Sequence, residues 1–195
     1  MEIISKGNKN IAVDILATAF KDNAGALWVI KKDNKIQARL KVLCNFCVDV
    51  AIEKNGAYIT ADQKGVALMF RSNARQRLLN WLNGYLSLGN YCIGWDRAWG
   101  MIQRERKILG FRPKDEHLYF WMVGVKDNSH GVDTIIEIRD FTFRRSRELM
   151  LPIVAETTSK KNLAVYQRYG FNVYNEWHVQ NQGITIWFLI RDWAR

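Results

Sequence analysis

The chain has 195 residues, of which 48% are hydrophobic and 25% are charged. A chain of this length can bury most of its apolar surface, so we expect one domain spanning residues 1–195, and the composition excludes an intrinsically disordered protein. Lys and Arg number 29 against 19 Asp and Glu, which gives a formal charge of +10. This excess favours the approach of anionic partners without selecting one.

The N-terminal residues show no sign of export or membrane insertion. The segment Met1–Lys6 has no basic region followed by an apolar stretch. No part of the chain reaches the ~18 consecutive apolar residues that a membrane-spanning helix requires. We therefore expect a cytoplasmic protein without a membrane partner.

The cysteines favour core packing over chemistry. Cys44, Cys47 and Cys92 are odd in number and lie in apolar segments, which disfavours the disulfide framework of a secreted protein. Cys44 and Cys47 form a C-x-x-C pair at helical spacing, but no second pair or nearby histidine accompanies them. We expect no metal site here.

The first half of the chain predicts helices around a short hairpin. After a short strand at Ile3 and Ile4, the β-prone segments Ala57–Thr60 and Val66–Phe70 flank a turn-forming tract, so they should pair as antiparallel strands. Apolar residues recur at helical spacing in segments that we expect to pack on this sheet. These predicted helices span residues 11–20, 36–51, 78–86 and 95–109.

Tryptophans are concentrated in the last two of these helical segments. Trp81, Trp95 and Trp99 could line a ligand cleft. Aromatic side chains at helical spacing more often belong to a core, so both interpretations stay open.

The second half of the chain alternates between strands and helices and ends in a hairpin. A β-hairpin followed by this alternation predicts an α/β (α+β) fold with a mixed, mostly antiparallel central sheet and helices on both faces. Its parallel pair should be formed by the first two strands of this half. The predicted elements are strand His117–Val125, helix Gly131–Met150, strand Pro152–Thr157, helix Asn162–Tyr169 and strands Asn172–Val179 and Ile184–Asp192.

A ligand is expected where the parallel pair ends. Open sheets with helices on both faces bind ligands at the carboxyl ends of parallel strands, beside helix N-termini. In this chain that place is the segment 125–134.

Three segments, with the order of elements around them, resemble the GNAT superfamily of N-acetyltransferases. They are Leu118–Val125, Leu151–Thr158 and Asn162–Phe171, and the element order extends the resemblance over nearly the whole chain. The resemblance implies that the strand 117–125 splays from the strand 152–157, so that the pantetheine arm of acetyl-CoA lies between them. Main-chain groups of Met122, Val123 and Val125 would then hold the pantetheine and the acetyl carbonyl.

The resemblance also implies a phosphate-binding helix start. The family has Gln or Arg followed by glycines at alternate positions, and the first main-chain N–H groups of the helix bind the pyrophosphate. His130 stands at the Gln or Arg position and can contribute charge when protonated. Gly131 keeps the first glycine, whereas Asp133 and Ile135 replace small residues. The implied pyrophosphate-binding residues are His130, Gly131, Val132, Asp133 and Thr134.

Asp133 would work against a bound pyrophosphate. Two like charges ~4 Å apart repel by ~1 kcal/mol in water and by ~4 kcal/mol at the effective dielectric of a protein surface. The side chain of Asp133 therefore either turns outward or weakens cofactor binding.

Tyr166 stands where many family members have the tyrosine that protonates the leaving thiolate. A phenol of pKa ~10 is protonated at neutral pH and can donate to a thiolate whose conjugate acid has a pKa of ~8.5. Tyr166 could equally pack with Tyr169 and Phe171. Asn162 should face the cofactor near the helix start.

The general base has two candidates, Glu156 and Glu116. A carboxylate within a predicted inner strand indicates either a role at the cleft or a buried ion pair, and the sequence leaves both open for Glu156.

The leading interpretation is transfer of an acetyl group from acetyl-CoA to a primary amine by direct attack, without a metal. One alternative is a catalytically impaired binding module, motivated by Asp133 and Ile135. Another is a nucleic-acid-binding protein, motivated by the charge and by the cluster Arg144, Arg145 and Arg147.

The apolar strand near the C-terminus leaves two possibilities for the oligomeric state. The segment Ile184–Ile190 could pair or pack across a homodimer, or lie buried on both faces within the sheet. The acceptor amine is not identified by the sequence.

Overall fold

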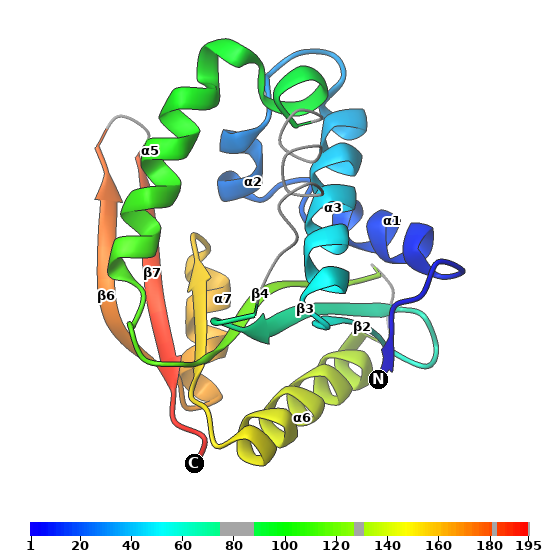
Figure 1. Ribbon diagram of the computed structural model, residues 1–195, viewed down its shortest axis with the longest axis vertical. Helices are drawn as coiled ribbons and strands as arrows, with labels where there is room; N and C mark the ends of the chain where they lie inside the picture. The colour runs from blue at the N-terminus through cyan, green and yellow to red at the C-terminus, as the bar shows by residue number, and fades with distance from the viewer. Residues whose placement is uncertain (75–87, 127–130, 181–182, 195) are drawn as a thin grey trace.

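A computed structural model describes residues 1–74, 88–126, 131–180 and 183–194 of the chain. They form one seven-stranded sheet in the order β1-β2-β3-β4-β5-β7-β6, with helices packed on both faces (Figure 1). Among these residues, no helix is long and apolar enough to cross a membrane. The strands are β1 (Glu2–Ile3), β2 (Ala57–Ile59), β3 (Gly65–Arg71), β4 (Leu118–Val125), β5 (Ile153–Thr157), β6 (Asn172–Val179) and β7 (Ile184–Arg191). The helices are α1 (Lys9–Ala19), α2 (Ala24–Val29), α3 (Ile36–Glu53), α5 (Trp95–Phe111), α6 (Gly131–Leu149) and α7 (Lys160–Arg168), with a π-helical turn, η1 (Gly89–Ile93).

The strand pairing confirms the fold class expected from the sequence. Every strand pair is antiparallel except β4 with β5, which is parallel. β7 lies between β5 and β6, so both of its edges are used within the chain and β6 forms the edge of the sheet. The apolar segment Ile184–Ile190 is thus an inner strand.

Most helices agree with the periodicity of the sequence, and the differences concern the N-terminal half. The short helix α2 was not predicted, because six residues are too few to establish a helical period. It begins at Asn23, whose side chain accepts a hydrogen bond from the N–H of Ala26 at 3.0 Å. The predicted helix 78–86, with Trp81, lies outside the described residues. Trp99 is 63% exposed, so it is not a core residue.

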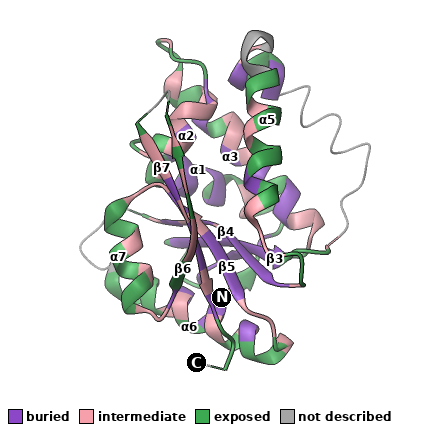
Figure 2. Cartoon of the chain, turned by 90° about the vertical axis from the view of Figure 1, so that its left-hand side faces the viewer, coloured by how far each residue is buried: buried purple, intermediate pink, exposed green. Residues whose placement is uncertain are grey.

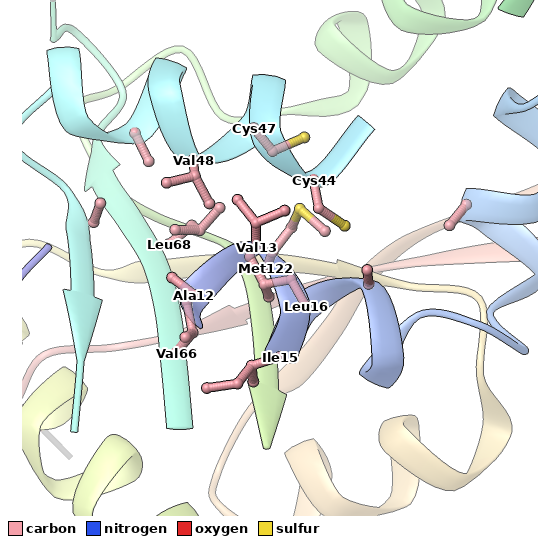
Figure 3. Packing of buried hydrophobic residues seen from close by; sticks show 14 of the residues in the cluster. Ala12, Val13, Ile15, Leu16, Cys44, Cys47, Val48, Val66, Leu68 and Met122 are labelled. Carbon is pink, nitrogen blue, oxygen red and sulfur yellow. The ribbon is translucent and has the colours of Figure 1, made fainter. Parts of the chain in front are cut away.

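The core on one face of the sheet is formed by α1 and α3 packed on β3 and β4. Leu16 and Val48 insert between the helices and the sheet, where they meet Leu68 and Met122 (Figure 3). Their burial removes the apolar stripe of each helix from water, which stabilises this layer.

The cysteines belong to this same core, as the sequence indicated. Cys44, Cys47 and Cys92 are free and buried. Burial raises the pKa of Cys44 to about 12 and that of Cys92 to about 11, so both thiols stay protonated and unreactive at neutral pH. No group of His, Cys, Asp and Glu side chains within the described part of the chain could hold a metal ion.

The opposite face of the sheet is covered by α6 and α7. Phe141 of α6 packs edge-on against Tyr58 with ring centroids 4.8 Å apart. Phe171, which follows α7 in the chain, belongs to the same buried cluster. Figure 2 shows the buried strands β4 and β5 between these layers, with the outer sides of α5 and α7 exposed. The two inner strands therefore have both faces covered.

Gly124 allows α1 to lie directly on β4. A Cβ atom at this position would stand 3.1 Å from Cδ2 of Leu16 and 3.2 Å from Cβ of Ala19. Both approaches are tighter than ordinary van der Waals contact, so a larger side chain would push α1 away from the strand.

We predict that Gly124→Val lowers the free energy of unfolding by about 1–3 kcal/mol, because the added methyl groups overpack this contact. Urea denaturation measures the change. Gly110→Ala is the control, since a Cβ atom at Gly110 meets open space on the helix α5 and should leave stability unchanged or raise it by up to ~1 kcal/mol. Equal stability of Gly124→Val and the wild type would contradict the close packing of α1 on β4.

Candidate active site

The strands β4 and β5 separate part-way along their length. Their parallel pairing ends at Phe120 and Ala155, although β4 continues to Val125 and β5 to Thr157. Beyond that point β5 stays paired with β7, and β4 stays paired with β3. The two strands therefore form a V-shaped opening, here called the β4–β5 opening, at their carboxyl ends.

A β-bulge in β4 lies at the base of this opening. Met122 stands opposite Leu68 while Phe120 stands opposite Met69, so Trp121 is an extra residue in β4. Trp121 and Met122 accordingly both pack on the α1 and α3 face, whereas neighbouring residues of a regular strand point to opposite faces.

The bulge reverses the direction of the main-chain groups that follow it. The N–H of Leu118 donates to the carbonyl of Pro152 at 2.9 Å, toward β5, and the N–H of Lys126 donates to the carbonyl of Lys64 at 2.8 Å, on the side of β3. Residues an even number apart should point the same way in a regular strand. The opposite directions of Leu118 and Lys126 therefore follow from the extra residue, Trp121.

Among the described residues, this reversal leaves two residues of β4 with unpaired main-chain groups at the opening. Because the N–H of Lys126 points to β3, alternation along the strand directs the main-chain groups of Met122 and Gly124 to β3 as well. Those of Val123 and Val125 are directed to the side where β5 has diverged. Of the three residues that the resemblance named, Val123 and Val125 thus direct main-chain groups into the opening. The bulge directs the main-chain groups of Met122 to β3.

The first turn of α6 lies just beyond the end of β4. The N–H groups of Val132 and Asp133 precede the first hydrogen bond within the helix, as at every helix start, and can receive an anion. Thr134 is buried against Gly65 at the start of β3, which fixes this helix end on the sheet. Val132 and Asp133 are exposed. His130 lies outside the described residues, and Gly131 begins the helix.

The side chain of Tyr166, on α7, packs against the buried cluster on the α6 and α7 face of the sheet. Its ring meets that of Phe171 edge-on at 5.1 Å, so the packing contact expected from the sequence is present. Burial raises the pKa of the Tyr166 phenol, which keeps it protonated and able to donate at neutral pH.

Glu156 forms the ion pair that the sequence offered as one of two alternatives. Its carboxylate accepts two hydrogen bonds from Arg112, at 2.6 and 3.1 Å, and a third from the hydroxyl of Tyr119 at 2.9 Å. The guanidinium of Arg112 also lies 4.0 Å above the Tyr119 ring. The Arg112 and Glu156 side chains are only 15% and 14% exposed, which makes this a largely buried network. Glu116 pairs with Arg71 at the other end of β4, far from the opening.

Solved structures with the same architecture identify the fold. A scan against protein families finds no match, and neither does a search of curated proteins. A histone acetyltransferase HPA2-related protein from Corynebacterium glutamicum is 18% identical with a TM-score of 0.70, and the match covers 98% of this chain and 94% of that one. The chain has a GNAT fold.

Two further solved structures share this architecture at still lower identity. The C-terminal condensation domain of Ebony, solved with beta-alanyl-dopamine, is 13% identical with a TM-score of 0.67 and covers 97% of this chain and 96% of that one. Arylalkylamine N-acetyltransferase 2 from Aedes aegypti is 11% identical with a TM-score of 0.64 and covers 98% of this chain and 97% of that one.

Tyr174 is a polar side chain that the sequence did not single out, on the same face of the sheet as the Arg112–Glu156 pair. Its hydroxyl oxygen is buried and has no hydrogen-bond partner among the described residues. Burial, and next the negative charge of Glu156, raise the pKa of Tyr174 to about 12, so the phenol remains a donor. No signal in the sequence distinguished Tyr174 from the other aromatic residues of the terminal hairpin.

Asn162 lies at the start of α7 but is exposed. Its N–H donates to the hydroxyl of Ser159 at 3.3 Å, so Ser159 caps the helix. The sequence signal was the serine three residues before Asn162, a common spacing at helix starts.

We predict that Arg112→Met lowers the free energy of unfolding by about 3–5 kcal/mol, because it leaves the carboxylate of Glu156 buried without its charged partner. Replacing both residues in Arg112→Met/Glu156→Leu should restore most of the loss. Guanidinium denaturation of both variants tests this.

The matched control for this pair is Arg144→Met, which removes an exposed arginine 3.9 Å from Glu148. It should change the free energy of unfolding by less than about 1 kcal/mol. A double variant as unstable as Arg112→Met would mean that the lost stability does not come from the unpaired carboxylate.

Proposed function

We propose that this chain transfers an acetyl group from acetyl-CoA to a primary amine by direct attack of the amine. The observation that supports this best is the β4–β5 opening, in which Val123 and Val125 present main-chain groups that none of the described strands uses. A pantetheine arm carries amides that pair with such groups as a neighbouring strand would.

The residues around the opening follow one another in the same order as the parts of acetyl-CoA. The pantetheine would lie along Val123 and Val125, and the pyrophosphate would meet the first turn of α6 at Val132, Asp133 and Thr134, next to Gly131 and His130. Acetyl-CoA would supply an activated acetyl group, whose carbonyl oxygen a main-chain N–H of β4 can polarise.

Tyr166 is proposed as the proton donor to the departing thiolate. Its helix follows β5 directly, and its phenol remains protonated because burial raises its pKa. Donation from a fixed phenol makes the thiolate a better leaving group than it would be unaided.

We propose a positioning role for Glu156. Arg112 and Tyr119 donate hydrogen bonds to both oxygens of its carboxylate. We therefore assign Glu156 the orientation of these two side chains, and not the removal of a proton from the amine. The buried hydroxyl of Tyr174, whose pKa responds to the charge of Glu156, offers a hydrogen bond to an acceptor on the same face.

The binding-module alternative depends on α6. Asp133 is exposed and Ile135 is 42% exposed, so neither side chain is held inside the fold, and both can face a bound cofactor or solvent. The nucleic-acid alternative is weakened, because Arg144 and Arg145 share an ion pair with Glu148.

We predict that isothermal titration detects a complex with acetyl-CoA and with CoA, and that Tyr166→Phe binds both with unchanged affinity. The variant should lose roughly 10²-fold or more in kcat for acetyl transfer, because it lacks the proton donor. Since the acceptor is unknown, transfer is assayed by CoA release over a panel of primary amines. Absence of binding at millimolar acetyl-CoA would refute the proposed function, and an unaltered kcat in Tyr166→Phe would refute the role of Tyr166 alone.

We predict that Asp133→Asn tightens CoA binding by about five-fold, which corresponds to relief of ~1 kcal/mol of repulsion between exposed charges. The gain should shrink as salt is added. Asp140→Asn is the control, because Asp140 is an exposed carboxylate on the same helix about 10 Å further from its start. Identical CoA affinity in the wild type and Asp133→Asn would show that the carboxylate points away from the pyrophosphate.

A further inference from the structure

A second concave region lies at the end of β3. Two adjoining hollows of about 400 Å³ each share Lys54, Phe70 and Asn73 in their walls. One hollow extends to Arg145 of α6, and the other extends to Lys114, which follows α5. We call the two hollows together the β3-end recess.

The β3-end recess is separate from the β4–β5 opening. Leu118 and Tyr119, at the start of β4, line the recess, whereas the opening begins beyond Phe120 and leads to the start of α6 after Val125. The eight residues of β4 span roughly 25 Å. A ligand in the recess would therefore not occupy the pyrophosphate position proposed for α6.

The recess has an excess of positive charge. Of its cations, Arg71 pairs with Glu116, Arg145 pairs with Glu148 and Arg112 pairs with Glu156. Lys54 and Lys114 form no ion pair within the described ranges. Glu116 is the one carboxylate among the residues that line either hollow.

Lys54 is the cation that is least compensated. Its ammonium group lies 4.4 Å from the centroid of the Phe70 ring, and the side chain is half-buried where the two hollows meet. Burial, and then the charge of Arg112, lower the pKa of Lys54. Since an aromatic face offsets only part of the cost of desolvating a charge, an anion beside Lys54 would lower the free energy of this region.

The remaining walls suit a small ligand with an apolar part. Met69, Leu118 and Leu149 contribute apolar surface to the hollow that contains Arg145, and Asn55 and Asn73 contribute side-chain amides. Each hollow falls within the size range of pockets that bind small molecules.

We propose that the β3-end recess binds a small molecule that carries phosphate groups, with Lys54 as the central contact and Lys114 as a second. This site is independent of acetyl transfer. It accounts for a partly buried ammonium between two hollows whose partner, among the residues that the structure describes, is an aromatic ring.

Titration calorimetry with inorganic pyrophosphate at low salt tests the site. Wild type should bind with a saturable heat, and Lys54→Gln should bind about ten-fold more weakly or worse, as expected for the loss of a charge-assisted contact. Lys114→Gln should show a smaller loss. The side-chain amide signals of Asn55 and Asn73 should shift on binding in two-dimensional NMR spectra.

Lys41→Gln is the matched control. Lys41 lies on α3, whose C-cap residue is Lys54, and its side chain is 59% exposed and pairs with Asp14, so its replacement removes the same charge outside the recess. Equal weakening in Lys41→Gln and Lys54→Gln, or no heat with wild type, would overturn the proposal. Pyrophosphate that binds regardless of Lys54→Gln but is displaced by CoA would also overturn it, while supporting the proposed function at α6.

Discussion

The extra residue at Trp121 is the constraint on which the candidate site depends. It reverses the main-chain direction along β4, so that Val123 and Val125 are directed away from β3. The separation of β4 from β5 after Phe120 would alone expose one edge of a strand, and the bulge decides which groups stand on that edge. Both features need rigid support, which the buried layers on the two faces of the sheet provide through Gly124 against α1 and Thr134 against β3.

The charged network of Arg112, Glu156 and Tyr119 links this opening to distant parts of the chain. Arg112 comes from the end of α5, Glu156 from the end of β5 and Tyr119 from the start of β4, and each satisfies the polar groups of the others. A largely buried ion pair of this kind adds little net stability over apolar packing, but it fixes side-chain positions. Its value here is that it fixes the end of α5 relative to the two diverging strands, on the face where Tyr174 has a buried hydroxyl without a described partner.

The sequence predicted the strands and long helices because their apolar periods are local, and it predicted the parallel pair from their order. It could not predict the bulge at Trp121, which exists only as a mismatch in register between β4 and β3. It could not choose between the alternatives for Glu156 either, since Arg112 is 44 positions away in the chain. The position of Tyr166 was readable from a local motif, whereas the free hydroxyl of Tyr174 depends on what packs around it in space.

We propose that main-chain groups of β4 left unpaired among the described residues hold acetyl-CoA, and amide hydrogen exchange measured by NMR tests this most directly. Without ligand, the amides of Val123 and Val125 should exchange faster than those of Met122 and Gly124, because alternation from the Lys126 bond directs only the latter two to β3. Saturating CoA should slow exchange at Val123 and Val125 and leave the other two unchanged. Slow exchange at all four amides without ligand, or CoA binding that protects neither Val123 nor Val125, would contradict the account.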